Sequence, residues 1–433
     1  MITFYGDKIA PNLKDKSLWN RFLEQHISNH INDTQHFTIH PQLDSHIFNY
    51  FKDDLSFKTF NEYQIGQKNL VIIGLHGGWT SLKLELIKEW FLTDANRLLA
   101  WNDPNCQIVL DYSEEGFTTE VFPGLWVWIN ENNLQDRVLY VSSSVNVTLL
   151  YHKWCRLNLA YHNMKTSWYG FFLSWIMKDR AMRRVTTELP LAQWNTSSPR
   201  YMCLNRRPHP HRILLITLLE RYGIIEKGAV SMPKHFGEVE VLWKSEDFDI
   251  PYQWTTLKNG LNGMIDSLDN DFDNMYNKLP LIADTDNFAF NYALNINEEY
   301  YVQFPLNIIS ETLFFTESTF TSEKVWKPML LGQLFLVMAG PYYLEGLRDL
   351  GFKTFSPYID ETYDTILDPV DRAIELVKSL KNLLSLNEQE FLNLLEHCQD
   401  AIQHNRALLT DLDRIGRLIS SQVVLAIENY WLD

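Results

Sequence analysis

TFTSEKVWKPMLLGQLFLVMAG, residues 319–340, is the most informative stretch of this 433-residue chain. It carries an adjacent acid and base, Glu323 and Lys324, at the start of an apolar helical pattern. Gly332, a short apolar strand over 334–338 and Gly340 follow. In an α/β protein, charged side chains at a helix N-terminus beside a strand end suit a phosphorylated, hydroxyl-rich ligand. The helix dipole and the free N–H groups favour anions there.

The sequence around this stretch alternates predicted strands with predicted helices. Apolar runs that predict strands lie at 70–75, 107–113, 137–144, 200–207, 279–285, 334–338 and 353–359, whereas residues 1–65 show only a weak pattern. Such βαβ spacing is typical of parallel sheets with helices on both faces. Ligands then bind beyond the carboxyl ends of the strands.

A Pro/Ser/Thr/Asn-rich cluster at 190–200 divides the chain and indicates a linker. We therefore predict an α/β fold of two Rossmann-like domains that face a cleft, followed by C-terminal helices. The predicted domains are an N-terminal Rossmann-like domain over 1–193 and a C-terminal Rossmann-like domain over 194–368, with the helices of 369–433 packed on both.

Composition and charge narrow the class of protein. The formal net charge of −16 disfavours a general grip on nucleic acid, although it leaves room for a local basic cleft. The four cysteines are far apart and indicate neither a zinc site nor a disulfide framework, so no metal site is predicted. The N-terminus lacks a signal pattern, and no apolar run reaches about 18 residues, so we expect a cytoplasmic protein without a membrane span.

The segment LNRRPHPHR, residues 204–212, places Arg206, Arg207 and Arg212 where a predicted strand ends and a helix begins. Guanidinium groups match phosphate oxygens with two parallel hydrogen bonds. A basic surface loop is the alternative, but the position at a strand–helix junction of an acidic chain favours phosphate binding.

At the start of the next helix, the carboxylate of Glu323 can accept hydrogen bonds from two ribose hydroxyls, and Lys324 can neutralise a diphosphate. The alternative is an ordinary helix cap, made by Thr321 or Ser322, with a solvated lysine. We favour the binding site because the helix is followed by a glycine-flanked strand.

The segment SEKVWKPMLLGQLFLVMAG resembles the C-terminal motif of α-1,3-fucosyltransferases and, more loosely, that of exostosin-like glycosyltransferases. Ser322 stands where that family usually has threonine. The longer stretch over residues 310–364 is similar to glycosyltransferase-like proteins of tailed phages and other large viruses, and LNRRPHPHR matches their basic strand-end element. The resemblance covers roughly residues 200–375, and the N-terminal half departs from the fucosyltransferases.

This resemblance implies a GT-B glycosyltransferase that moves a sugar from a UDP- or GDP-sugar to an acceptor hydroxyl, without a metal or another cofactor. Ser322, Glu323 and Lys324 would hold the donor ribose and diphosphate, together with Arg206, Arg207 and Arg212. Basic side chains would stabilise the departing diphosphate. The domain over 194–368 would bind the nucleotide sugar, and the domain over 1–193 would bind the acceptor. A non-catalytic glycan- or nucleotide-binding protein is the alternative from a different class.

A general base must take the proton of the acceptor hydroxyl, and it is expected from the N-terminal domain. Asp111, Glu114 and His76 each lie near the end of a predicted strand there. The alternatives are a turn cap for Asp111 and a hydrogen-bonded structural histidine for His76.

A basic segment over 178–184, preceded by aromatic residues, raises a second acceptor class. Arg180, Arg183 and Arg184 could grip a nucleic acid strand, which suggests a viral DNA-modifying enzyme in the host cytoplasm that glycosylates a hydroxylated base. A solvated helix end is the alternative.

The acidic run DNDFDN at 269–274 lacks the glycine of a calcium loop and is expected to be a solvated loop.

Overall fold

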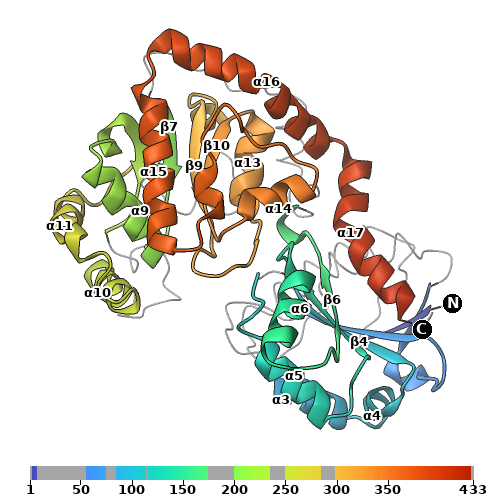
Figure 1. Cartoon of the computed structure of the whole chain (residues 1–433). Coiled ribbons are helices and arrows are strands. Elements are labelled where there is room, and N and C mark those ends of the chain that lie inside the picture. Colours follow the sequence, from blue (N-terminus) through green and yellow to red (C-terminus); the bar gives the residue numbers. More distant parts are fainter. Residues whose placement is uncertain are drawn as a thin grey trace. The chain divides into compact units, whose positions relative to one another are not determined.

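The computed structural model describes residues 2–6, 55–74, 84–113, 116–173, 199–234, 249–283 and 298–430. The chain forms two compact units, drawn in Figure 1. The first comprises Met1–Ser174 with Gly416–Asp433, and the second comprises Trp175–Ile415. The predicted domain boundary at 193/194 lies outside the described residues.

The first unit is built on a six-stranded sheet in the order β2-β1-β3-β4-β5-β6, in which every described pair of neighbours is parallel. Its strands are β1 (Ile2–Gly6), β2 (Leu55–Thr59), β3 (Asn69–Gly74), β4 (Cys106–Tyr112), β5 (Val138–Ser142) and β6 (Lys165–Trp168). β4 and β5 are buried along their whole length, which explains their continuous apolar sequences. The pattern of residues 1–65 had not indicated β1 and β2, which are only five residues long.

Helices alternate with the strands of this sheet as predicted. They are α3 (Leu84–Leu92), α4 (Ala95–Asn102), α5 (Phe122–Glu131) and α6 (Val147–Leu157), and most of the C-terminal α17 (Leu412–Asn429) also belongs to this unit. α4 begins at Asp94, whose side chain accepts hydrogen bonds from the N–H groups of Asn96 and Arg97.

The second unit has a four-stranded sheet in the order β10-β9-β7-β8, again with parallel neighbours. Its strands are β7 (Tyr201–Leu204), β8 (Gly228–Ser231), β9 (Leu306–Ser310) and β10 (Leu334–Met338). Because all four strands run the same way, their carboxyl ends share one edge of the sheet.

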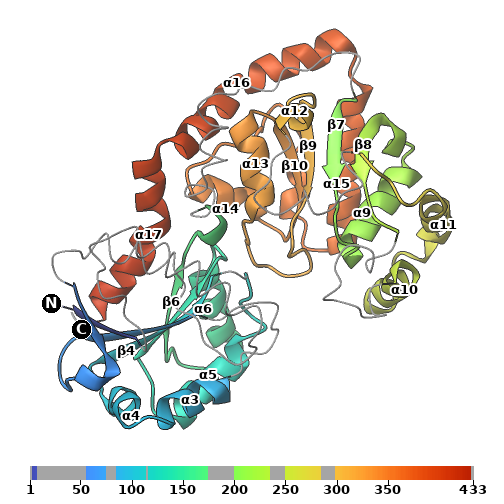
Figure 2. The same cartoon turned by 180° about the vertical axis from the view of Figure 1, so that it is seen from behind.

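The helices of the second unit pack on this sheet or on one another. They are α9 (Pro210–Arg221), α10 (Ile250–Gly260), α11 (Asp269–Asn277), α12 (Glu298–Tyr301), α13 (Glu323–Leu331), α14 (Tyr343–Asp349), α15 (Pro369–Ser385) and α16 (Glu388–Thr410). α15 contacts α9 and β10, and α13 contacts α16 and β10, whereas α10 and α11 pack on α9. Figure 2 shows the same elements from behind, with α13 again beside β10. The short 3-10 turns of the two units are Phe60–Glu62, Ile225–Lys227, Asp266–Leu268 and Thr362–Thr365.

The structure confirms the elements predicted for residues 319–340. α13 begins after Ser322, whose side chain accepts a hydrogen bond from the Lys324 N–H. It ends at Gly332, which has a φ of 73°, a left-handed conformation that glycine adopts without a steric cost. β10 follows and is buried throughout.

Three predictions of local structure were wrong. Residues 353–359 form no strand, because Pro357 has no N–H group and Glu361 accepts the Phe355 N–H at 2.6 Å. In 279–283, the described part of another predicted strand, the structure has only an isolated bridge between Leu281 and Met232. The acidic run at 269–274 lies in α11 and is no loop, since acidic residues stabilise the first turn of a helix.

The fold prediction of an α/β chain with two Rossmann-like domains and C-terminal helices is confirmed. The cleft between the domains stays a prediction. Among the helices that the structure describes, none is long and apolar enough to cross a membrane.

Candidate functional site

The carboxyl edge of the second sheet gathers the residues predicted to bind the donor. β7 ends at Leu204, just before Arg206 and Arg207, and β9 ends at Ser310, just before Glu311. α9 and α13 begin at this same edge, because each follows a strand of the parallel sheet. This edge is where open α/β sheets bind ligands.

Arg212 lies in the first turn of α9 and is the most enclosed of the three arginines, with 5% of its surface exposed. Its Nη1 donates to the backbone oxygen of Arg207 at 3.2 Å, whereas its Nε has no hydrogen-bond partner among the described residues. Burial lowers its pKa to about 10, although the nearby carboxylates of Glu323 and Glu311 act to raise it. Arg212 is therefore a buried cation with donor capacity left for an anion.

Two histidines lie between Arg207 and Arg212 in the chain and add no positive charge. Burial lowers the pKa of His209 to about 3, helped by the positive charges of Arg212, Arg207 and Lys324. Burial likewise lowers the pKa of His211 well below its usual value. The Nε2 of the neutral His211 lies 2.7 Å from the backbone oxygen of Glu311 and must carry the proton, because a carbonyl only accepts.

The ammonium group of Lys324 lies close to two hydroxyl oxygens and two carboxylate oxygens. Nζ donates to Ser322 Oγ at 2.9 Å and to Thr312 Oγ1 at 3.1 Å. It also lies 3.6 Å from Glu311 Oε2 and 3.7 Å from Glu323 Oε1, with 27% of the side chain exposed. The group is thus held in place and still reachable from solvent.

Glu323 keeps its negative charge although its side chain is only 13% exposed. Burial acts to raise its pKa, but Lys324, Lys327 and Arg212 outweigh burial and lower the pKa overall. Lys327, one helical turn further along α13, has its own pKa lowered to about 8, mainly by burial. An ionised carboxylate here can accept hydrogen bonds from ligand hydroxyls.

Glu311 also lies at this site, although it was not among the site residues predicted from the sequence. It is fully buried, and its carboxylate accepts hydrogen bonds from the Ser322 N–H at 3.1 Å, the Ser322 hydroxyl at 2.6 Å and the Tyr343 hydroxyl at 2.8 Å. A signal was present in the sequence, because Glu311 directly follows a strand whose carboxyl end lies at the ligand-binding edge.

Two N–H groups at the start of α13 already have partners. The Ser322 N–H donates to Glu311 Oε1, and the Lys324 N–H donates to Ser322 Oγ at 3.3 Å. The sequence pattern had predicted free N–H groups at this helix start, so that prediction was wrong for these two groups. In the structure, the cationic side chains of Arg212 and Lys324 are therefore more available to an anion than these two N–H groups.

In the first unit, the structure describes one of the three predicted base candidates. His76 and Glu114 lie outside the described residues. Asp111, in β4, is fully buried, and its Oδ1 accepts the Ser113 N–H at 3.0 Å, which is the turn-cap alternative. This burial weighs against Asp111 as a base, although its assignment stays a prediction.

The three arginines predicted to bind a nucleic acid acceptor also lie outside the described part of the chain: Arg180, Arg183 and Arg184. Their role in acceptor binding stays a prediction. Within the described ranges, no three His, Cys, Asp or Glu side chains are grouped as ligands of a metal ion.

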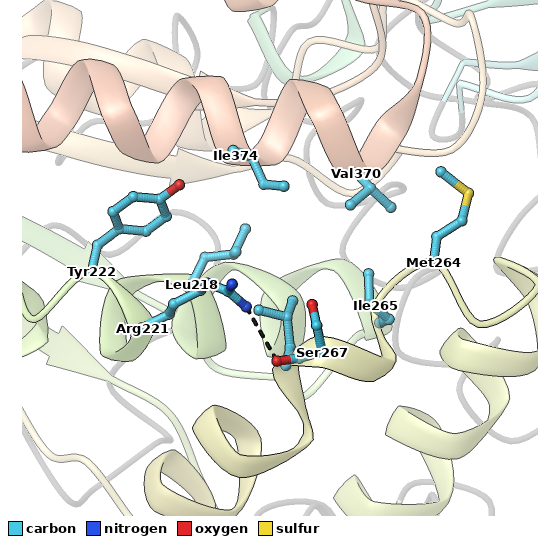
Figure 3. A pocket seen from close by; sticks show the side chains of 9 residues that line it. Leu218, Arg221, Tyr222, Met264, Ile265, Ser267, Val370 and Ile374 are labelled. Carbon is cyan, nitrogen blue, oxygen red and sulfur yellow. Dashed lines mark hydrogen bonds between the residues drawn. The ribbon is translucent and has the colours of Figure 1, made fainter.

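A small pocket lies elsewhere on the second unit, where α9 ends against α15 (Figure 3). Its volume is about 110 Å³, and Arg221, one of its lining residues, donates to the backbone oxygen of Ser267 at 3.2 Å. Arg221 is nine residues beyond Arg212 on the same helix, which corresponds to roughly 14 Å along its axis. This pocket is therefore distinct from the charged site at the start of α9.

No protein-family model matches the chain, and no curated protein matches its sequence. Solved structures do resemble it. The N-terminal domain of trehalose-6-phosphate phosphatase from Candida albicans is 12% identical, with a TM-score of 0.38, and the match covers 96% of this chain and 82% of that one.

Two bacterial structures are similar to the same degree. The α,α-trehalose 6-phosphate synthase of Burkholderia multivorans is 10% identical, with a TM-score of 0.39 and coverage of 90% of this chain and 74% of that one. The UDP-forming α,α-trehalose-phosphate synthase of Burkholderia vietnamiensis is also 10% identical, with a TM-score of 0.38 and coverage of 90% and 77%. Because these similarities are so distant, the activity and substrate of this protein are inferred below from its site residues alone.

Proposed function

We propose that this protein is a glycosyltransferase of GT-B architecture that moves a sugar from a nucleoside diphosphate sugar to an acceptor hydroxyl. The second unit binds the donor, and the first unit supplies the acceptor site. The observation that carries the proposal is the meeting of Arg212, Lys324 and Glu323 at the carboxyl edge of one parallel sheet.

This arrangement suits both parts of such a donor. Arg212 and Lys324 are cations that can neutralise a diphosphate, and the Nε of Arg212 offers a further donor. The ionised Glu323, whose charge both cations stabilise, can accept hydrogen bonds from the vicinal hydroxyls of a ribose.

The proposed reaction forms a bond between the acceptor oxygen and the anomeric carbon and breaks the bond from that carbon to the diphosphate. The acceptor proton passes to a base, for which Asp111, Glu114 and His76 are the proposed candidates. Negative charge grows on the diphosphate as it leaves, and Arg212 and Lys324 stabilise that charge without requiring a metal ion.

We expect Glu323→Ala to separate ribose binding from phosphate binding. UDP or GDP should bind about tenfold to a hundredfold more weakly, because a charged acceptor of two hydroxyl groups is lost. Pyrophosphate, which has no ribose, should bind at least as well as it does to the unchanged protein, since a nearby negative charge is removed. Calorimetric titration with each ligand measures both effects.

Glu226→Ala is the matched control, because Glu226 also pairs with a lysine, at 3.1 Å, but near the opposite end of α9. Equal losses for UDP and pyrophosphate in the Glu323 variant would refute the ribose assignment. If UDP and GDP bind but neither UDP- nor GDP-sugars are turned over, the protein is the non-catalytic binder.

A hydroxylated DNA base is a second candidate acceptor, supported by the basic and aromatic segment over 168–184. Replacing Arg180, Arg183 and Arg184 together by alanine should abolish a gel shift with duplex DNA at low salt. The unchanged protein should lose that shift steeply as salt rises, because binding releases counterions. Absence of any shift at low salt rules out the DNA acceptor and leaves the donor site untouched.

A further inference from the structure

Glu311 joins the two elements that form the donor site. Its backbone oxygen accepts a hydrogen bond from His211, the neighbour of Arg212 on α9. Its side chain binds Ser322 and lies 3.6 Å from the ammonium group of Lys324 on α13. One residue thus ties the arginine side of the site to the lysine side.

The surroundings of Glu311 hold its carboxylate in a single orientation. Oε1 accepts hydrogen bonds from the Tyr343 hydroxyl and the Ser322 N–H, while Oε2 accepts the Ser322 hydroxyl and lies within 3.3 Å of the Thr312 N–H. These donors come from the end of β9, the start of α13 and the start of α14. A fully buried carboxylate with this many hydrogen-bond donors restrains the positions of the side chains that bind it.

We infer that Glu311 is a positioning residue of the donor site, which sets the Ser322 cap and the Lys324 ammonium group in the arrangement that a diphosphate needs. This inference rests on the proposed function. Glu311 itself is buried behind Ser322 and Lys324, so it acts through them and not by contact with the ligand.

Electrostatics and positioning predict effects of opposite sign. If Glu311 served only as a negative charge near an anion site, its removal would strengthen binding of a diphosphate, because the local potential becomes more positive. If it positions Lys324, its removal weakens binding despite that gain. A merely structural residue would lower thermal stability without changing the affinity of the folded protein.

The test compares UDP binding to the full chain, its Glu311→Gln variant and a Glu220→Gln control, by calorimetric titration at low salt. Glutamine keeps the shape of the side chain and removes its charge. Glu220 is a matched control, because it makes an ion pair with Lys278 at 2.8 Å near the far end of α9. We expect the dissociation constant to rise about tenfold in Glu311→Gln, the effect of losing one charge-assisted contact, and to stay unchanged in Glu220→Gln.

Unchanged or tighter UDP binding by folded Glu311→Gln overturns the inference, while the proposed function stands as long as the unchanged protein binds UDP. If the unchanged protein binds neither UDP nor GDP, the proposed function fails and the inference falls with it. Should Glu311→Gln not fold, as judged by circular dichroism, Tyr343→Phe decides. It removes one neutral donor to Oε1 and leaves the charge in place, so positioning predicts severalfold weaker binding and a purely electrostatic effect predicts none.

Discussion

Replacing Lys324 by methionine should lower sugar transfer about a hundredfold to a thousandfold, the range seen when one group that stabilises developing charge is removed. Methionine keeps most of the apolar stem and loses the ammonium group. The loss also leaves Glu311 and Glu323 without the cation that lies 3.6 Å and 3.7 Å from them, so two carboxylates then oppose the departing diphosphate. Steady-state rates with a UDP- or GDP-sugar, separated into kcat and KM, measure the effect.

The fall should appear mainly in kcat, because the negative charge of the diphosphate is greatest as it leaves. Lys278→Met is the matched control: Lys278 pairs with Glu220 and Glu226, near the far end of α9, and its replacement should leave kcat within a factor of about two, as expected for a surface pair. A Lys324 variant with full kcat would remove Lys324 from the proposed chemistry.

Gly340→Ala should destabilise the protein strongly. A Cβ atom at Gly340 would lie 2.3 Å from the backbone oxygen of Thr316, and a backbone atom cannot turn aside as a flexible side chain does. We expect a loss of about 3 kcal/mol in the free energy of unfolding, the upper part of the range for overpacked sites. Urea unfolding of the full chain measures this change.

The displaced segment leads directly into Ser322, so donor binding should weaken together with stability. Gly260→Ala is the matched control, because Gly260 ends α10 and, apart from its chain neighbours and the backbone of its own helix, no atom lies within 4 Å of a Cβ built there. That variant should be as stable as the unchanged protein or up to about 1 kcal/mol more stable, since alanine favours helices. Similar losses in both variants would contradict the steric explanation.

Local sequence patterns predicted most of the elements that carry the site. The run of apolar residues in β10, the Ser322 cap and Gly332 each act within a few neighbouring residues, so their signals are visible in the chain alone. Prediction failed where tertiary contacts decide the structure. The Phe355 N–H donates a hydrogen bond to Glu361 and not to a neighbouring strand. The acidic residues of α11 form a helix, and Asp269 in its first turn pairs with Lys258 of α10.

The same division holds for the site. The sequence placed Arg212 where a strand ends and a helix begins, and Glu323 and Lys324 at the start of another helix. The parallel order of the strands brings these positions to one edge of the sheet. The sequence did not indicate Glu311 as their common partner, because its contacts to His211 and Tyr343 span 100 and 32 residues of chain.

Hydrophobic periodicity and glycine positions are local properties, so the chain alone indicates repeated strands and helices in parallel α/β units, with charged residues near particular strand ends and helix starts. Which charges are buried, which N–H groups already have partners and which carboxylate joins α9 to α13 became visible only in the folded protein. Burial and hydrogen bonding depend on segments that meet only when the sheet has formed.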